Sequence, residues 1–260
     1  MRHRSQETNT AFATTVAHGL AVVECFRVGE PVLSNKDLVE RTGLSKATIS
    51  RLTYTLVLKG LLMYDANLRR YRLGSSLLSL SYPLLASMKV RQLARPYMKD
   101  LADLAGGSVS LGLYDKLHMV YVETSRGHDA IAFRPDIGAR LPVLASAIGM
   151  TWLAQAPDPV RQDIVHTIMQ NDPNYYSRNA DSWRQAKIDF SRKGYCVSLG
   201  GWQSDVHAVA VPLPTPVNGD VMVFNCGVPV ARLKEGQLEG LIAPRLLAMV
   251  REINALLEAS

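Results

Sequence analysis

The chain has 260 residues, with 29 Lys and Arg against 23 Asp and Glu, so its formal net charge is +6. Its three cysteines, Cys25, Cys196 and Cys226, lie too far apart in sequence for a disulfide framework or a zinc site, and we expect no metal and no cofactor. No apolar run reaches the roughly 18 residues that span a bilayer, and the polar N-terminus carries no secretory signal, so we expect a cytoplasmic protein.

The positive charge is concentrated in the first third of the chain. Residues 1–75 hold eleven Lys and Arg against six Asp and Glu, whereas the remaining residues hold eighteen against seventeen. A basic segment on a nearly neutral body favours a nucleic-acid contact, because neutralising phosphates supplies most non-specific affinity for DNA. Charge alone leaves a solvated basic surface as the alternative.

The first elements are three helices. Apolar spacing predicts a helix over residues 16–27, and its expected inward face is Val16, Ala17, Leu20, Val23 and Phe26. Ser34 is a suitable N-cap for a second helix over 35–41. Gly43 suits a tight turn, because glycine adopts left-handed backbone without strain. Ser45 then caps a third helix over 46–59, which ends at Gly60. Two short strands follow as a hairpin, over 61–64 and 70–73.

The remaining chain predicts an α+β fold. Residues 74–88 form an apolar, uncharged segment, which we expect to be a linker helix interrupted at Pro83. Strands are expected as hairpins, over 109–114 with 119–124, and over 206–213 and 221–226. Helices are expected over 90–105, 145–155, 159–170, 180–193 and 238–257. This pattern favours an antiparallel sheet with packed helices. The predicted domains are 1–75, 76–90 as a linker helix, and 91–260.

The order helix, helix, turn, helix, hairpin is that of a winged helix-turn-helix. In this motif the second helix of the pair enters the major groove, and the wing reaches the backbone or the minor groove. We therefore expect an outward, DNA-binding set of residues: Ser34, Lys46, Ala47, Thr48, Ser50, Arg51, Arg69 and Arg70. A small helical bundle that binds protein is the alternative to this interpretation.

At these residues the chain resembles the IclR family of bacterial transcription regulators. The segment LSKATISRLTYTLVLKGLLMYDANLRRYRLG is similar to the family's DNA-binding domain. Three later segments are similar to its effector domain: SVSLGLYDKLHMVYVETS, GARLPVLASAIGMTWLA and RKGYCVSLGGWQSDVHAVAVPL. Each motif alone is only moderately specific, but they occur in the same order over most of the chain.

The resemblance implies a GAF-like effector domain, homodimers that pair into tetramers, and the place of a ligand. By motif, with Ser146 added at the start of the predicted helix, the effector-binding residues are Ser146, Ala147, Ile148, Ser198, Leu199, Ala208, Phe224, Asn225 and Cys226. The segment AIGMTWLA also resembles a subgroup that regulates the breakdown of aromatic acids. No arginine falls clearly in this pocket, although Arg126, Arg134 and Arg140 precede the helix and can close over it.

Some positions depart from the family pattern. Gly201 stands where a glutamate is usual, Met150 where a lysine is usual, and Pro83 is unusual in the linker. The family also has an aromatic residue or histidine near Pro214. These departures concern the polar contacts of the pocket and the straightness of the linker.

The sequence thus predicts a transcription regulator that binds double-stranded operator DNA and is controlled by a small organic acid, with no membrane partner. An enzyme is disfavoured, because the chain carries no GxSxG, HExxH, GxGxxG or P-loop motif. A second alternative is an interaction protein, such as an anti-repressor, that keeps the fold without binding DNA.

Overall fold

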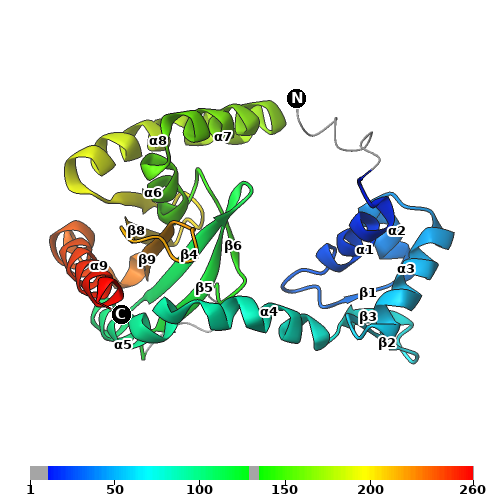
Figure 1. Ribbon diagram of the computed structural model, residues 1–260. Coiled ribbons are helices and arrows are strands. Elements are labelled where there is room, and N and C mark those ends of the chain that lie inside the picture. The colour runs from blue at the N-terminus through cyan, green and yellow to red at the C-terminus, as the bar shows by residue number, and fades with distance from the viewer. Residues whose placement is uncertain (1–10, 129–134, 260) are drawn as a thin grey trace. The chain divides into compact units, whose positions relative to one another are not determined.

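The computed structural model of the chain describes residues 11–128 and 135–259. It divides into two compact units, Met1–Ser87 and Met88–Ser260, whose elements are labelled in Figure 1. No helix in the described ranges is both long and apolar enough to cross a membrane.

The first unit is a winged helix-turn-helix. Its elements are α1 (Thr14–Glu24), β1 (Val32–Leu33), α2 (Asn35–Thr42), α3 (Lys46–Leu58), β2 (Leu62–Asp65), β3 (Arg70–Leu73) and α4 (Ser76–Ser87). The three strands pair antiparallel in the order β1-β3-β2, so the short β1, which sequence did not predict, joins the wing hairpin. The first three helices surround a core that includes Leu38, Ile49, Leu52, Leu56 and Leu62.

Helix α1 presents to this core a face that matches the expected one only in part. The expected Val23 and Phe26 pack against the core, but Val16 and Leu20 are 61% and 58% exposed, and Val22 and Cys25 are buried instead. On a helix with 3.6 residues per turn these two groups lie about half a turn apart. The helix carries apolar residues on both sides, so periodicity alone did not identify the side that contacts α2 and α3.

The expectation that Pro83 interrupts the linker was wrong. Helix α4 continues through Pro83 to Ser87, and the break falls at Met88, before α5 begins. Proline removes one N–H donor from a helix, and here the turns on either side keep the helical path. Two side chains also hydrogen-bond to the backbone of this helix: Ser81 Oγ donates to the Leu78 carbonyl, and Ser87 Oγ donates to the Leu84 carbonyl. None of the residues of α4 is buried.

The second unit is built on a six-stranded antiparallel sheet in the order β6-β5-β4-β9-β8-β7. Its strands are β4 (Ser108–Asp115), β5 (His118–Arg126), β6 (Arg140–Pro142), β7 (Cys196–Leu199), β8 (Val206–Pro212) and β9 (Met222–Pro229). The two edge strands, β6 and β7, were not predicted, because three or four residues carry too little alternation to identify a strand.

Within the described residues of this unit, five α-helices and two shorter helical segments accompany the sheet. They are α5 (Lys89–Ala105), α6 (Ala147–Gln155), α7 (Asp158–Asn171), α8 (Pro173–Lys193), η1 (Val230–Arg232), η2 (Leu238–Ile242) and α9 (Ala243–Glu258). Helix α8 starts earlier than expected, because the Asp172 carboxylate accepts the Tyr175 N–H at 2.8 Å and caps the helix. The expected closing helix begins as a π-helical segment, η2, before α9.

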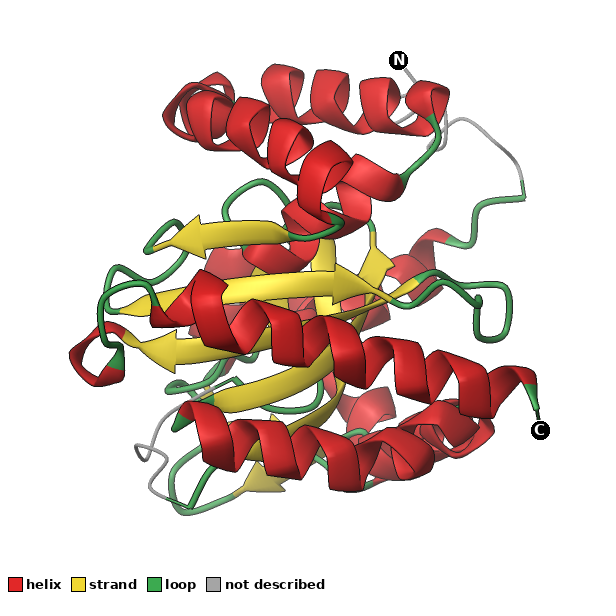
Figure 2. Cartoon of the chain, turned by 90° about the vertical axis from the view of Figure 1, so that its left-hand side faces the viewer, coloured by secondary structure: helices red, strands yellow, loops and turns green. Residues whose placement is uncertain are grey.

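Different helices cover the two faces of the sheet. Helices α5 and α9 pack against each other and cross one face, α5 over β4 and β5 and α9 over β8 (Figure 2). Helix α6 lies against the other face, where it contacts β8, β9 and β7, and α8 packs on α6 from outside. The α+β fold is confirmed, and both faces of the sheet are buried by helices.

Helix α6 lies unusually close to the chain that precedes it. A Cβ atom on Gly149 would lie 2.4 Å from the carbonyl oxygen of Val143 and 2.5 Å from its Cα atom. Real Cβ atoms do not approach backbone so closely, and Val143 is itself fully buried. The contact therefore requires glycine at this position, and it sets the depth of α6 on the sheet.

We predict that Gly149→Ala lowers the free energy of unfolding of the second unit by about 2 kcal/mol, the range for overpacking a core. The overlap outweighs the roughly 1 kcal/mol by which alanine is the better helix former. Gly240→Ala is the matched control, because nothing lies within 4 Å of a Cβ atom there. Urea unfolding followed by tryptophan fluorescence measures this unit alone, since Trp152, Trp183 and Trp202 all lie in it. Equal stability of the two variants would contradict the prediction.

Candidate functional site

The N-terminus of α2 is fixed by a capping box. The Ser34 Oγ accepts the Asp37 N–H at 3.3 Å, while the Asp37 carboxylate accepts the Ser34 N–H at 2.7 Å and the Ser34 hydroxyl at 2.8 Å. Hydrogen bonds from Ser34 lower the pKa of Asp37, and the nearby Arg70 and Arg41 lower it further. The Ser34 hydroxyl, expected at the DNA, thus has a structural role inside the unit.

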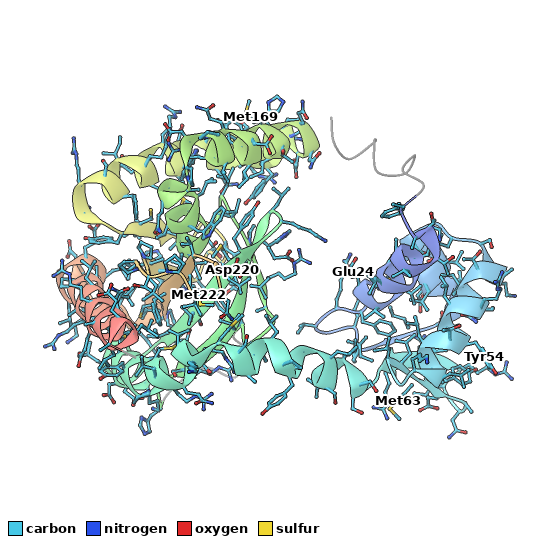
Figure 3. The ribbon with its side chains drawn as sticks, in the orientation of Figure 1. Glu24, Tyr54, Met63, Met169, Asp220 and Met222 are labelled. Carbon is cyan, nitrogen blue, oxygen red and sulfur yellow. The ribbon has the colours of Figure 1, made fainter. Side chains whose placement is uncertain are left out.

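Helix α3 presents an exposed stripe that begins at its N-terminus. Ala47, Ser50, Arg51 and Tyr54 recur at helical spacing and are exposed, and Tyr54 is 68% exposed. The Tyr54 side chain points outward from the helix (Figure 3). Thr48 is half-buried, and its hydroxyl lies 2.9 Å from that of the N-cap Ser45. The stripe therefore offers one guanidinium, one hydroxyl, one methyl group and one aromatic ring to a groove.

The cations of this unit differ in their availability. Arg70 of the wing lies 3.8 Å from the Asp37 carboxylate, so it is engaged within the unit. Lys46, Arg51 and Arg69 form no ion pair within the described part of the chain, and all three are exposed. Arg69 sits at the wing tip with a left-handed φ of 52°. Unpaired, exposed cations on the helix and the wing are suited to phosphates and guanine edges.

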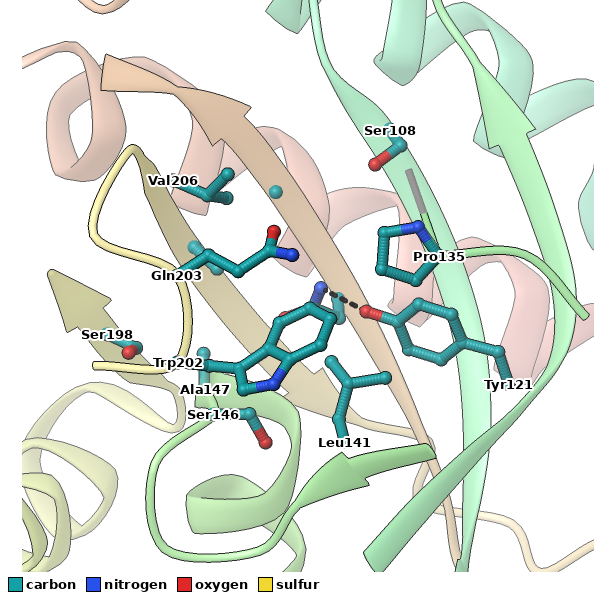
Figure 4. Close-up of a pocket in the computed structure, with 13 residues that line it drawn as sticks. Ser108, Tyr121, Pro135, Leu141, Ser146, Ala147, Ser198, Trp202, Gln203 and Val206 are labelled. Carbon is teal, nitrogen blue, oxygen red and sulfur yellow. Dashed lines mark hydrogen bonds between the residues drawn. The ribbon is translucent and has the colours of Figure 1, made fainter. Parts of the chain in front are cut away.

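A cavity that is partly open to solvent lies in the second unit, between the sheet and the start of α6 (Figure 4). It is lined by Ser108, Tyr121, Pro135, Leu141, Ser146, Ala147, Ser198, Trp202, Gln203, Val206, Ala208, Asn225 and Gly227. No Lys, Arg, His, Asp or Glu occurs among these described lining residues. An apolar cavity with a few fixed neutral polar groups is typical of a small-molecule site.

The polar groups of the cavity are held by hydrogen bonds. Asn225 Nδ2 donates to the Tyr121 hydroxyl at 3.0 Å, across 104 residues of sequence. Burial raises the pKa of the Tyr121 phenol, and hydrogen bonds with Ser110 and Asn225 lower it by less. The phenol therefore stays neutral at physiological pH. Tyr121 and Asn225 form a neutral hydrogen-bonding wall (Figure 4).

The N-terminus of α6 borders the same cavity. The N-cap Ser146 accepts the Gly149 N–H at 3.2 Å, and its hydroxyl donates to the Pro142 carbonyl at 2.7 Å. The N–H groups of Ala147 and Ile148 have no acceptor in the described part of the chain. A helix N-terminus with open N–H groups attracts anions, because the peptide dipoles add at that end.

Strand β7 meets the start of α6 at a close contact. Ser198 Oγ donates to the Ala145 carbonyl at 3.0 Å. A Cβ atom on Gly201 would lie 2.6 Å from the same carbonyl and 2.9 Å from Ser198 Oγ. A side chain at position 201 would therefore overlap this contact, and glycine avoids the overlap.

The structure places the residues of the expected effector site in two groups. Ser146, Ala147, Ser198, Ala208 and Asn225 line the cavity together. Ile148, Leu199, Phe224 and Cys226 do not. Ile148 is buried in the core, and Leu199 is 68% exposed at the edge of the sheet. Phe224 and Cys226 flank Asn225 on β9, so the alternation of the strand turns them toward the opposite face.

Several lining residues are outside the expected effector-binding set. Tyr121 comes from β5, and Trp202 and Gln203 come from the turn between β7 and β8. Trp152, in contrast, stacks on Tyr114 with ring centroids 3.9 Å apart and belongs to the core. Of the three arginines expected near the pocket, Arg126 pairs with Asp136 and Arg140 with Asp115, and Arg134 lies outside the described residues.

Two other kinds of site find no support among the described residues. No group of three or more His, Cys, Asp or Glu side chains there can hold a metal ion. The three cysteines are free and buried, and burial raises the pKa of the Cys196 thiol to about 12. Such thiols are poor nucleophiles at neutral pH.

Two family models match the chain. The IclR helix-turn-helix domain matches residues 15–66, and the bacterial transcriptional regulator IclR C-terminal domain matches residues 83–255. Among curated proteins, the regulator TsaQ1/TsaQ2 of Comamonas testosteroni is 30% identical and covers 98% of this chain and 92% of its own. The regulator XynR of Escherichia coli is 32% identical and covers 86% of this chain and 89% of its own.

Solved structures agree with this likeness. An IclR family transcriptional regulator from Brucella abortus superposes with a TM-score of 0.85 and 38% identity, over 96% of this chain and 95% of that one. An IclR homolog from Microbacterium hydrocarbonoxydans, complexed with 4-hydroxybenzoate, has a TM-score of 0.75 and 23% identity, over 95% of this chain and 100% of that one. At 23% identity, the likeness to the Microbacterium homolog shows a shared fold only.

The capping box generates a prediction about stability. Ser34→Ala removes the acceptor of the Asp37 N–H, so we expect the local stability of α2 to fall by about 1 kcal/mol, the usual cost of losing an N-cap. Ser50→Ala is the control, because Ser50 is exposed and its hydroxyl forms no hydrogen bond within the described residues. Hydrogen exchange of the α2 amides measures the change. Unaltered exchange in Ser34→Ala would show that the cap does not stabilise the helix.

Proposed function

The chain belongs to the IclR family of bacterial transcriptional regulators, and from this premise we propose that a small aromatic acid, bound in the cavity beside α6, controls its binding to operator DNA. Like its relatives, the chain is a DNA-binding regulator and not an enzyme. The observation that carries the ligand proposal is a cavity whose described lining residues carry no charge and which the N-terminus of α6 borders.

The proposed DNA contacts follow from the exposed stripe of α3. Arg51 is placed to pair with a guanine edge or a phosphate, and Ala47 to touch a thymine methyl group. Lys46 lies at the start of the helix, where phosphate is already favoured. Arg69 reaches out from the wing. Thr48, Ser34 and Arg70 are secondary in this proposal, because each has a partner inside the unit.

The proposed ligand is an acid with an aromatic ring. Its carboxylate is held by the N–H groups at the start of α6, near Ser146 and Ala147, and no side-chain cation is required. The ring lies between Trp202 and Leu141, and a polar substituent reaches the Tyr121–Asn225 wall. The benzoate bound to the Microbacterium homolog supports this class of ligand, as does a relative named as the p-hydroxybenzoate hydroxylase transcriptional activator.

The proposed division of labour within the chain is a DNA-binding domain over 1–75, a linker over 76–90 and an effector domain over 91–260. The boundary between the compact units, at Ser87 and Met88, falls inside that linker. A ligand controls DNA binding only if it fits one arrangement of the chain better than another, because only a difference in affinity shifts an equilibrium.

The first prediction of this proposal concerns DNA. Arg51→Ala is expected to weaken operator binding by about 1–3 kcal/mol, the cost of one lost base contact. Arg70→Ala is the comparison, and we expect a smaller loss because Arg70 is engaged with Asp37. Electrophoretic mobility shift with DNA from upstream of the protein's own gene measures both. Wild-type affinity in a folded Arg51→Ala protein would remove Arg51 from the interface.

The second prediction concerns the cavity. Ala208→Trp fills the space beside Asn225, so the response to aromatic acids should be lost while operator affinity stays unchanged. Leu199→Trp is the matched control, because Leu199 is exposed and lies outside this cavity. Thermal shift against a panel of aromatic acids, including 4-hydroxybenzoate, measures binding, since a saturating ligand raises apparent stability. A wild-type response in Ala208→Trp would place the ligand elsewhere.

The third prediction concerns assembly. Leu78, Leu80, Tyr82 and Leu84 of α4 are each more than half exposed, and a monomer leaves this apolar surface in water. We propose a homodimer, or a tetramer made of two dimers, that reads two half-sites together. Light scattering at micromolar concentration should give at least twice the mass of one chain. A mass of one chain only would contradict the proposal.

A further inference from the structure

Strand β5 contains an extra residue in its pairing with β4. From Asp115↔His118 to Gly112↔Tyr121 the two strands pair residue by residue, and the register then shifts, so that Leu111 pairs with Glu123. Val122 is left without a partner on β4. This is a β-bulge, which bends a strand and changes the direction of the side chains beyond it.

The bulge decides which face of the sheet Tyr121 and Glu123 occupy. Residues two apart on a regular strand share a face. Here the extra residue intervenes, so Tyr121 lies beside Gly112 on the cavity face and Glu123 lies beside Leu111 on the face covered by α5. Tyr121 accordingly lines the cavity, while Glu123 is 3% exposed and meets two arginines of α5.

Arg91 of α5 holds the bulge at two points. Its Nε donates to the carbonyl of Val122, the extra residue, at 2.7 Å, and its second guanidinium nitrogen lies 3.3 Å from the Glu123 carboxylate. Arg95, one turn later, reaches the same carboxylate oxygen at 2.8 Å but does not contact Val122. A carboxylate this deeply buried requires such partners, because an unpaired charge is costly away from water.

The opposite side of the bulge is tightly packed. A Cβ atom on Gly112 would lie 2.9 Å from Ile148 Cδ1 of α6, 3.0 Å from the Val120 carbonyl and 3.4 Å from the Tyr121 ring. The Tyr121 ring thus lies against bare backbone, with α6 behind it. A change in the bulge must therefore move the Tyr121 ring as well.

We infer that Arg91 and Glu123 are positioning residues for the cavity, which act through the bulge to hold the Tyr121 hydroxyl at Asn225. The inference rests on the proposed function in one respect only, that the cavity takes a ligand. It also makes α5, the first helix of the second unit, part of the ligand site, although α5 lies on the other face of the sheet.

The test uses Arg91→Lys and a matched control in the full-length protein. Lysine keeps the positive charge beside Glu123, but it lacks the fork that reaches the Val122 carbonyl and the carboxylate together. Arg95→Lys is the control, because Arg95 pairs with the same carboxylate and is 57% exposed in its side chain, whereas the hydrogen bond to the extra residue Val122 comes from Arg91. Thermal unfolding first establishes that both variants are folded.

The first measurement needs no ligand. In Arg91→Lys the amides of residues 120–124 and 224–226 should exchange hydrogen about tenfold faster, with α9 unchanged, because the opening is local. In Arg95→Lys the same amides should exchange as in the wild type. Unchanged exchange in Arg91→Lys, or faster exchange spread over the whole unit, overturns the inference.

The second measurement is a double-mutant cycle with Tyr121→Phe, using 4-hydroxybenzoate as the probe. If Arg91 acts through Tyr121, Arg91→Lys weakens binding of the probe by about fivefold when Tyr121 is present. The same substitution weakens binding by less than about twofold in the Tyr121→Phe background, because the effects of coupled residues on binding are not additive. Equal losses in both backgrounds overturn the inference. If the wild type does not bind 4-hydroxybenzoate and the exchange pattern is as expected, the proposed ligand is wrong and the positioning role stands.

Discussion

The alternation of side chains along the central strands is the constraint on which the second unit depends. Toward α6 and the cavity, β4, β8 and β9 carry mostly small or polar residues, with Val206 and Val223 as larger members of this face; the small or polar ones are Ser108, Ser110, Gly112, Ala208, Ala210, Asn225 and Gly227. Toward α5 and α9 they carry Val109, Leu111, Val209, Val211, Phe224 and Cys226. Large apolar side chains fill the space under two long helices, whereas small ones let α6 approach the sheet and leave room for a ligand.

The described lining of the cavity that results carries no charged side chain. The arginines nearest the cavity in sequence, Arg126 and Arg140, form ion pairs with Asp136 and Asp115. An acid in the cavity then depends on oriented N–H groups at α6 and on neutral donors, because a buried carboxylate without hydrogen bonds is strongly disfavoured. Such a site discriminates by the polar groups that a wrong ligand leaves unpaired, such as the Tyr121–Asn225 wall.

The DNA-binding unit could be predicted more completely than the cavity. Its turn, caps and helix order depend on interactions between residues three or four positions apart, such as Ser34 with Asp37 and Ser45 with Thr48. The face of α1 was predicted only in part, because Val16 and Leu20 are as apolar as the buried Val22. In the cavity, motif similarity indicated the β9 segment as a whole, and it did not separate Asn225 from Phe224 and Cys226, which the period of two along a strand places on the other face.

The sequence by itself determined the two-part organisation, the basic first third, the helix caps and the hairpins, since each depends on local spacing or on composition. Only the tertiary structure decided how distant segments meet, because those contacts have no local signal. Ser198 reaches Ala145 across 53 residues, and Asn225 reaches Tyr121 across 104. The single extra residue at Val122 places Tyr121 and Glu123 on opposite faces of the sheet. A regular period of two along β5 predicts the same face for both residues. The bulge is visible only in the pairing of β5 with β4, where Arg91 donates a hydrogen bond to the extra residue.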